Sequence, residues 1–153
     1  MRKEVKVMAS GVTDRGRAKL LNYAFDGTTA PTTFYYALCT DATTPTVATN
    51  LFSDLTEIAT GNGYTQFGNS MASDTAFTVT EVDGTPGAKC VLSNQEFTGS
   101  GGTLPSSGSA RWAVLLDTNA TSANVLAWFD LSANTSVSDG QTLSINASTI
   151  NVS

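Results

Sequence analysis

The residues that could do chemistry in this chain are two cysteines and thirteen carboxylates. The sequence contains no histidine, which excludes Ser-His-Asp and Cys-His catalysis and every zinc site with a histidine ligand. Cys39 has no basic residue nearby in the sequence to stabilise a thiolate. Cys39 and Cys90 each lie in a strand-like apolar run, so we expect both to be small buried residues. A disulfide between them stays an open alternative.

The carboxylates could in principle supply the acid pair of a glycosidase or the oxygen ligands of a calcium site. Asp41 and Asp54 are too scattered for a calcium-binding loop. Four other acids fall in turns or at the ends of predicted elements, where solvent explains them: Asp26, Asp83, Asp117 and Asp139. We therefore expect a protein that is not an enzyme and that has no metal site and no cofactor.

One glycine cluster, at residues 99–102, could be read as a phosphate-binding loop. Neither a predicted helix nor a lysine follows it, so we interpret it as part of a loop rather than as a phosphate-binding site. The wider segment, residues 99–109, is rich in Gly and Ser and is predicted to be a flexible loop.

Positive charge is concentrated at the start of the chain. Up to Lys19 there are six basic and two acidic residues, a local charge of +4, in a protein whose net charge is −5. This asymmetry predicts that the basic start docks on an acidic surface, which could be a neighbouring copy or a different partner; a solvated arm is the alternative. The candidate interface consists of basic side chains and both tryptophans: Arg2, Lys3, Lys6, Arg15, Arg17, Trp112 and Trp128.

Other partner classes are disfavoured. The basic segment has no aromatic residue before Tyr23 and the rest of the chain is acidic, so we expect no nucleic-acid binding. No apolar run approaches the roughly 20 residues of a membrane span, so we expect no membrane contact. At 153 residues the length predicts one domain, residues 13–153, preceded by a basic N-terminal arm, residues 1–12.

Residues 110–131 are the stretch around which we expect the fold to be organised. Two apolar runs flank a polar loop, residues 118–124, which predicts two antiparallel strands. In the first run, Trp112, Val114 and Leu116 point to one side and Ala113 and Leu115 to the other. Strands that are apolar on both faces belong at the centre of a sheet or at a subunit contact.

A helix signal precedes the strands. Thr13 can cap it, Gly27 can end it, and apolar residues recur at spacings of three and four, which predicts an amphipathic helix over residues 14–25 lying on a sheet. Its apolar positions are Ala18, Leu21, Ala24 and Phe25.

Shorter signals complete the chain. We expect strands at residues 4–9, 32–40 and 64–67, a short helix at 50–59, a turn at 61–63, a hairpin of 76–82 with 89–97, and a final run broken by a bulge or bend near Ala147. Short strands with turn signals predict a mainly β protein: an antiparallel, jelly-roll-like β-sandwich of about seven or eight strands with one short N-terminal α-helix.

Several motifs in a fixed order resemble a group of small structural proteins of tailed-phage virions. They are Thr-Asp-Arg-Gly-Arg-Ala-Lys-Leu-Leu-Asn-Tyr-Ala-Phe (13–25), Ala-Pro-Thr-Thr-Phe-Tyr-Tyr-Ala-Leu-Cys-Thr (30–40), Gly-Asn-Gly-Tyr (61–64), the pair 111–117 and 126–128, and Val-Ser-Asp-Gly-Gln-Thr-Leu-Ser-Ile (137–145). The resemblance covers most of the chain from Thr13 onward. It implies a β-sandwich made in many copies, assembled in the host bacterial cytoplasm and located in the virion.

Within that resemblance we expect a head decoration (cement) protein that stabilises the capsid by bridging subunits of the major capsid protein. A homo-oligomer, with a trimer favoured, would suit the low-charge, Thr/Ser-rich body. The alternative is a tail or tail-fibre module that binds the host surface; its loops 41–49 and 99–109 contain no aromatic residue to stack on sugars. A depolymerase is a third, disfavoured reading.

Overall fold

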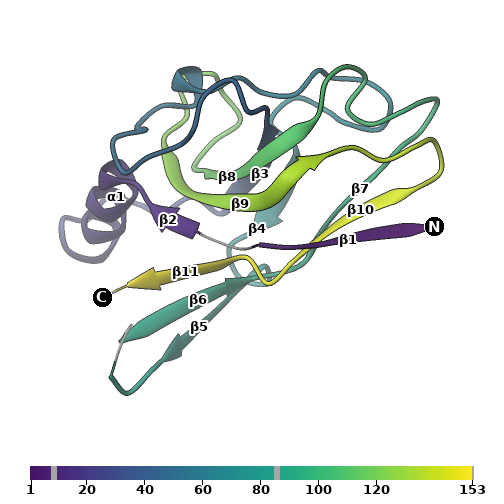
Figure 1. The fold of residues 1–153 in the computed structure, drawn as a ribbon. Coiled ribbons are helices and arrows are strands. Elements are labelled where there is room, and N and C mark those ends of the chain that lie inside the picture. Colours follow the sequence, from purple (N-terminus) through teal and green to yellow (C-terminus); the bar gives the residue numbers. More distant parts are fainter. Residues whose placement is uncertain (8–9, 85–86, 153) are drawn as a thin grey trace.

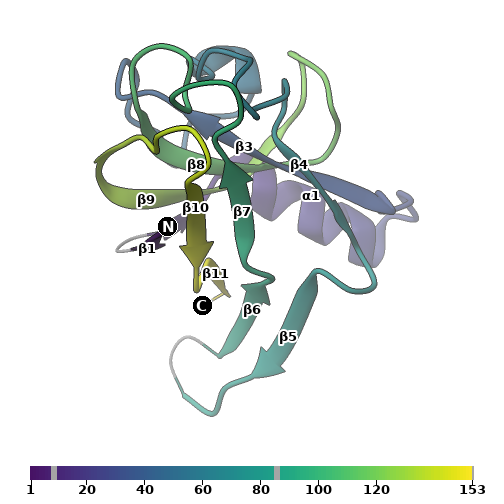
Figure 2. The ribbon, with the colours of Figure 1, turned by 90° about the vertical axis from the view of Figure 1, so that its right-hand side faces the viewer.

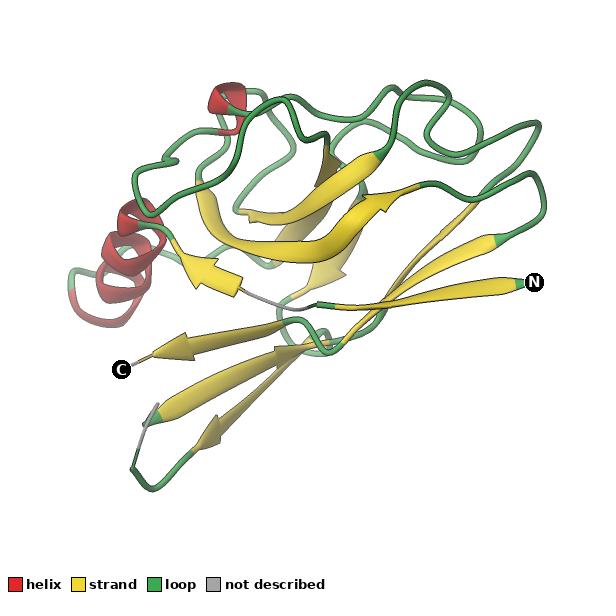
Figure 3. Ribbon diagram, in the orientation of Figure 1, coloured by secondary structure: helices red, strands yellow, loops and turns green. Residues whose placement is uncertain are grey.

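The computed structural model describes residues 1–7, 10–84 and 87–152. Figures 1 and 3 show a mainly β protein with α1 at one side of the sheets. The elements are β1 (Arg2–Lys6), β2 (Ser10–Val12), α1 (Asp14–Phe25), β3 (Thr33–Cys39), the 3-10 turn η1 (Phe52–Asp54), β4 (Asn69–Ala72), β5 (Phe77–Glu81), β6 (Ala88–Leu92), β7 (Gln95–Thr98), β8 (Ala110–Leu116), β9 (Val125–Thr135), β10 (Thr142–Asn146) and β11 (Thr149–Val152). The predicted fold class, a mainly β sandwich with one N-terminal helix, is confirmed, but the described residues form eleven strands rather than the seven or eight expected, and one pair, β1 with β10, is parallel.

A five-stranded sheet in the order β2-β9-β8-β3-β4 forms the centre of the molecule. All neighbouring strands in it are antiparallel. Ala113 and Leu115 of β8 pack into the larger apolar cluster on one face, whereas Val114 and Leu116 pack into a second cluster on the other face. The prediction that residues 110–131 form a hairpin covered on both sides is therefore confirmed.

Two three-stranded sheets form the remaining layer, in the orders β1-β10-β7 and β11-β6-β5. Thr142 pairs with Thr98 in one sheet, and Thr149 pairs with Val91 in the other. As many residues separate Thr142 from Thr149 as separate Val91 from Thr98, so the register continues from one sheet into the other. The two sheets are thus one long ribbon that bends where Ala147 adopts a positive φ of 60°. This bend confirms the break predicted from the change of alternation in the final run.

The sheet β11-β6-β5 projects from the rest of the molecule, and we call it the wing (Figures 1 and 2). Its hairpin, β5 with β6, was predicted and is confirmed, but the second predicted strand, residues 89–97, is divided between β6 in the wing and β7 in the other three-stranded sheet. Thr85 and Pro86, part of the predicted turn, lie outside the described residues.

The first strand is paired within the chain. β1 lies parallel to β10, and Val5 is buried in the larger apolar cluster. Residues 2–6, expected as part of an arm, therefore add a strand to a sheet edge. Met8 and Ala9, the end of the predicted strand 4–9, lie outside the described residues.

Two sequence predictions between Asn50 and Phe67 were wrong. The expected helix 50–59 is only the turn η1, because the backbone N–H of Ile58 donates to Leu38 O and that of Thr40 donates to Thr56 O, so the segment pairs with the end of β3. The expected strand 64–67 is absent from the described structure, because Phe67 and Gly68 both have positive φ and turn the chain before β4 begins. The Gly61–Gly63 turn is confirmed: Asn62 and Gly63 have φ of 51° and 93°.

Candidate docking groove

The first turn of α1 clamps the helix to the central sheet. Thr13 is completely buried; its Oγ1 accepts a hydrogen bond from Gly16 N at 2.8 Å and donates to Val125 O. Its backbone N–H donates to Leu126 O at 3.1 Å. This confirms Thr13 as the helix cap, and Gly27, with φ of 82°, follows the last turn as predicted. The helix is therefore held at its start and projects from the sheet edge.

The apolar side of α1 faces outward, which corrects the expectation that it is buried on a sheet. Gly16 is the only buried residue that the helix contributes among the described residues. Leu21 is 59% exposed and Phe25 is 83% exposed, and Ala18 and Ala24 are also exposed. Because Gly16 occupies the contact with β9, the side of the helix that touches the sheet is the one without large apolar side chains.

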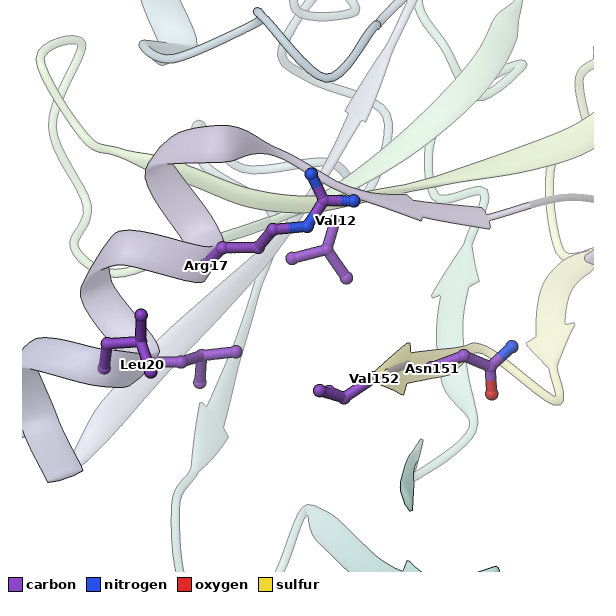
Figure 4. Close-up of a pocket in the computed structure, with 6 residues that line it drawn as sticks. Val12, Arg17, Leu20, Asn151 and Val152 are labelled. Carbon is purple, nitrogen blue, oxygen red and sulfur yellow. The ribbon is translucent and has the colours of Figure 1, made fainter. Parts of the chain in front are cut away.

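An apolar groove separates α1 from the wing. Leu20 and Arg17 form one wall, Val12 lies at its base, and Val152 of β11 faces them from the other side, as Figure 4 shows. A second hollow of about 320 Å³ continues from it and shares Val12, Leu20 and Val152 with the first, which has a volume of about 240 Å³. The deeper hollow reaches residues from several strands: Phe34, Phe77, Val79, Cys90, Leu115, Leu126 and Ile150.

The polar residues of the groove lie at its margins. Arg17 Nη1 donates to Asp14 Oδ1 at 3.1 Å, an exposed pair within the first turn of the helix. Asn151, Ser73 and Lys89 complete the polar lining, and no carboxylate occurs among the lining residues in the described ranges. An apolar surface with few polar groups is suited to binding another apolar surface.

Opposite charges lie on the two sides of this groove. α1 carries three basic residues, Arg15, Arg17 and Lys19, and one acidic residue, Asp14. The segment 74–92, which includes the β5–β6 hairpin, has the reverse balance: Asp74, Glu81 and Asp83 against Lys89. Across the described part of the chain, no ion pair joins the helix to the hairpin. The helix is therefore net basic and the segment that carries the wing hairpin is net acidic, but its three carboxylates lie outside the residues that line the groove, where Lys89 is the charged residue of the wing.

The three predicted basic anchors of the N-terminal segment lie elsewhere. Figure 1 shows β1 with its start at the end of the molecule opposite α1. Arg2 pairs with Glu96 and donates to Ser144 Oγ at 2.7 Å, and Lys3 Nζ donates to Ser136 O at 3.3 Å. Lys6 is exposed. These side chains are partly used within the chain and do not reach the groove.

The other predicted interface residues divide between the groove and the core. Arg15 and Arg17 are both exposed on α1, and Arg17 lines the groove whereas Arg15 does not. Trp112 is only 9% exposed and packs in the second apolar cluster, beneath the guanidinium of Arg111 at 4.4 Å from its ring. Trp128 is half-buried and lies over Gly11 of β2. The structure thus does not bring the seven predicted residues into one surface.

The cysteines are free thiols, which answers the question of a disulfide between them. Cys39 is fully buried, and burial raises the pKa of its thiol. Cys90 is half-buried in the groove, and burial raises its pKa as well. Within the described residues no cluster of His, Cys, Asp or Glu could hold a metal ion, and none of the helices is long and apolar enough to cross a membrane.

Sequence reasoning missed the groove because its walls come from distant segments. Val79 and Val152 each belong to a short predicted strand, and nothing within either strand indicates the distant segment that it faces. One signal was present: Gly16 interrupts a helical pattern, and a glycine inside a helix often marks a close backbone contact on that side. A prediction that put the sheet against Gly16 would have oriented Leu21 and Phe25 away from the sheet.

Comparison with known proteins identifies the chain's relatives. A family model described as the podophage GP4 fiber I protein gp80 matches residues 11–153. No curated protein and no solved structure matches the chain. The match begins at Gly11 in β2, so β1 lies outside the matched residues. β1 also precedes the motifs that carry the sequence resemblance. The expected class, a structural protein of the phage virion, is confirmed at this level. Since the match spans nearly the whole chain, the protein belongs to the family of the podophage GP4 fiber I protein gp80.

Proposed function

We propose that this protein is a structural component of the tail fibre of a tailed phage and that it works through protein contacts rather than chemical turnover. The observation that carries this proposal is the match of residues 11–153 to a family named for a fibre protein. The apolar groove beside α1 supports it, because a large exposed apolar surface marks an interaction site.

This proposal places the fibre ahead of head decoration. The decoration hypothesis relied on a basic arm that grips the major capsid protein. Residues 2–6 instead pair with β10, and Arg2 is engaged by Glu96 and Ser144. That use of the arm inside the chain reduces the support for a capsid anchor and agrees with a fibre role.

Within a fibre, we assign the protein to the framework rather than to sugar recognition. The loop 99–109 is tied to its neighbours: Asn62 Nδ2 donates to Thr103 O at 2.8 Å, and Ser106 Oγ donates to Thr60 O at 2.9 Å. Neither this loop nor the loop 41–49 carries an aromatic residue for stacking on a sugar ring. Other virion proteins, including further copies of this chain, are then the partners.

The test is the position of the protein on purified virions, measured by immunogold electron microscopy with antibodies against the folded domain. We expect gold at the tail fibres. Gold distributed over the head would overturn the fibre proposal and restore the decoration hypothesis. Turnover of host capsule or cell-wall polymer by the purified protein would overturn its non-enzymatic part.

A further inference from the structure

We propose that the groove between α1 and the wing is the binding site for a second copy of this chain. This inference deepens the proposed function, on which it rests, because it names the partner that covers the surface already described. The occupant is the exposed apolar side of α1, formed by Leu21 and Phe25, of the second copy.

The exposed apolar side chains of the molecule are concentrated at this groove. In the described part of the chain, the large exposed apolar residues are Met1, Leu20, Leu21, Phe25, Val47, Val79 and Val152. All except Met1 and Val47 belong to α1 or the wing. Single exposed apolar residues are ordinary on a protein surface, whereas a concentration around one hollow indicates a covered face.

Charge complementarity points to a second copy as the covering partner. The helix has an excess of basic residues, and the segment 74–92 has an equal excess of acidic residues. Arg17 precedes Leu21 by one helical turn, and Glu81 follows Val79 by two residues on β5, so when α1 of one copy covers the groove of another, Arg17 approaches Glu81 of that copy. Opposite charges that face each other across an interface favour one partner and one orientation.

The edge of the wing also suits a protein partner. β5 is the last strand of its sheet, and its residues from Thr78 to Glu81 are exposed. Proteins usually protect such edges with lysine or proline; β1 carries Lys3 and Lys6, but β5 carries neither residue type. Because this exposed edge lies beside the apolar groove, a single contact can cover both.

The contact we propose is reciprocal. In a two-fold pair the same patch is used by both copies, so the helix of each one covers the groove of the other. A two-fold pair therefore has twice the apolar and ionic contacts of an arrangement in which only one helix occupies one groove. A stable pair of this kind buries on the order of 1,600 Å² in total.

The first experiment measures association of the full chain by sedimentation velocity and light scattering over a concentration series. We expect a reversible oligomer, and the paired substitution Leu21→Glu with Phe25→Glu should weaken its association by roughly 30-fold or more. The matched control is Val47→Glu, because Val47 is 46% exposed but does not line the groove. Association of the paired variant equal to wild type would overturn the proposal.

A charge-exchange experiment tests whether the occupant is a second copy. Arg17→Glu and Glu81→Lys each place like charges at both contacts of a homodimer, so each variant alone should associate more weakly than wild type. In an equimolar mixture, the new glutamate at position 17 of one variant can meet the new lysine at position 81 of the other, and the unaltered Arg17 and Glu81 meet at the second contact. The two variants should therefore form mixed dimers at close to wild-type strength. Failure of the mixture to recover association, with both variants folded by circular dichroism, would contradict the helix-on-wing arrangement.

The association experiments and the virion labelling can fail independently of each other. A wild-type chain that stays monomeric at concentrations on the order of 100 µM would overturn the second-copy proposal and leave a fibre location untouched. If the monomeric chain nevertheless needs Leu21 and Phe25 for incorporation into virions, the groove binds a different virion protein. Gold on the head together with reversible dimers would overturn only the fibre proposal.

Discussion

Gly16 of α1 lies directly against the carbonyl oxygen of Leu126 on β9: a Cβ at position 16 would stand 2.1 Å from that oxygen. The opposing atom is backbone, so it cannot move aside as a side chain could. This contact allows the first turn of the helix to sit on the sheet, and it orients the apolar side of the helix toward the groove.

We expect Gly16→Ala to destabilise the protein, although alanine is favoured over glycine in a helix interior by about 1 kcal/mol. The clash with Leu126 should outweigh that gain and reduce the free energy of unfolding by about 2 kcal/mol. Urea denaturation measures it. Ala24→Gly on the exposed side of the same helix is the control and should cost only the helix-propensity difference, about 1 kcal/mol. A stabilised Gly16→Ala variant would contradict the close contact.

Thr13 should contribute as both a cap and a tether. Thr13→Val keeps the shape but removes the acceptor for Gly16 N and the donor to Val125 O, so we expect a loss of about 2 kcal/mol in unfolding free energy. Thr13→Ser keeps the hydroxyl and should retain most of that stability. Thermal and urea unfolding of the two variants provide the comparison, and equal stability would argue against a role for the hydroxyl.

Asp130 should stabilise the fold at neutral pH and lose this effect in acid. Hydrogen bonds from Arg111, followed by the backbone N–H of Ser132, hold the pKa of Asp130 below its ordinary value. The ionised carboxylate therefore favours the folded state above its unfolded-state pKa of about 4, and this contribution disappears as the pH falls through the lowered folded-state pKa. Asp130→Asn should lower the free energy of unfolding by about 1 kcal/mol at pH 7. This difference in unfolding free energy between the variant and wild type should shrink below about pH 4. Urea unfolding at several pH values checks this; a constant difference would be inconsistent with the pairing.

Glu57 should show the opposite dependence. Burial raises the pKa of Glu57 and outweighs its hydrogen bonds from Tyr64 Oη, at 2.8 Å, and Phe67 N. A raised folded-state pKa favours folding below the unfolded-state value of about 4.3, and that contribution is lost as the pH rises through the folded-state pKa. Glu57→Gln keeps an acceptor without the buried charge, so its stability relative to wild type should be higher at pH 7 than at pH 4.

Glu57→Ala is the control for the hydrogen bonds at this site. It removes the acceptor for Tyr64 and Phe67 and should reduce the unfolding free energy by about 1–3 kcal/mol at either pH. The same pH series of urea unfolding curves serves both variants. If Glu57→Gln behaved like Glu57→Ala at pH 7, the ionised carboxylate would be a net stabilising group, contrary to the direction given by burial.

Local signals predicted several elements closely. The helix begins and ends as expected because Thr13 and Gly27 act through their own backbone and nearest turn. The Asn62-Gly63 turn and the bend at Ala147 were likewise visible, since each depends on residues next to one another in the sequence. The two-faced burial of β8 followed from the unbroken apolar run of its last five residues, 112–116.

Other elements were decided by partners distant in the sequence. Residues 56–58 look helical alone but pair with the end of β3. Asn69–Ala72 lacks strong β formers and becomes β4 because β3 offers it an edge. The parallel pairing of β1 with β10 joins the two ends of the chain, and no local pattern encodes such a neighbour.

The amino-acid sequence by itself determined a β-rich domain with one capped helix, a concentration of basic charge near its start, and the family to which the chain belongs. Only the tertiary structure decided which apolar residues are left uncovered. Periodicity defines an apolar side of a helix, but whether that side meets a sheet depends on where the helix is anchored. Here the missing side chain of Gly16 allows close contact with Leu126, and the same contact leaves Leu21 and Phe25 exposed beside the wing.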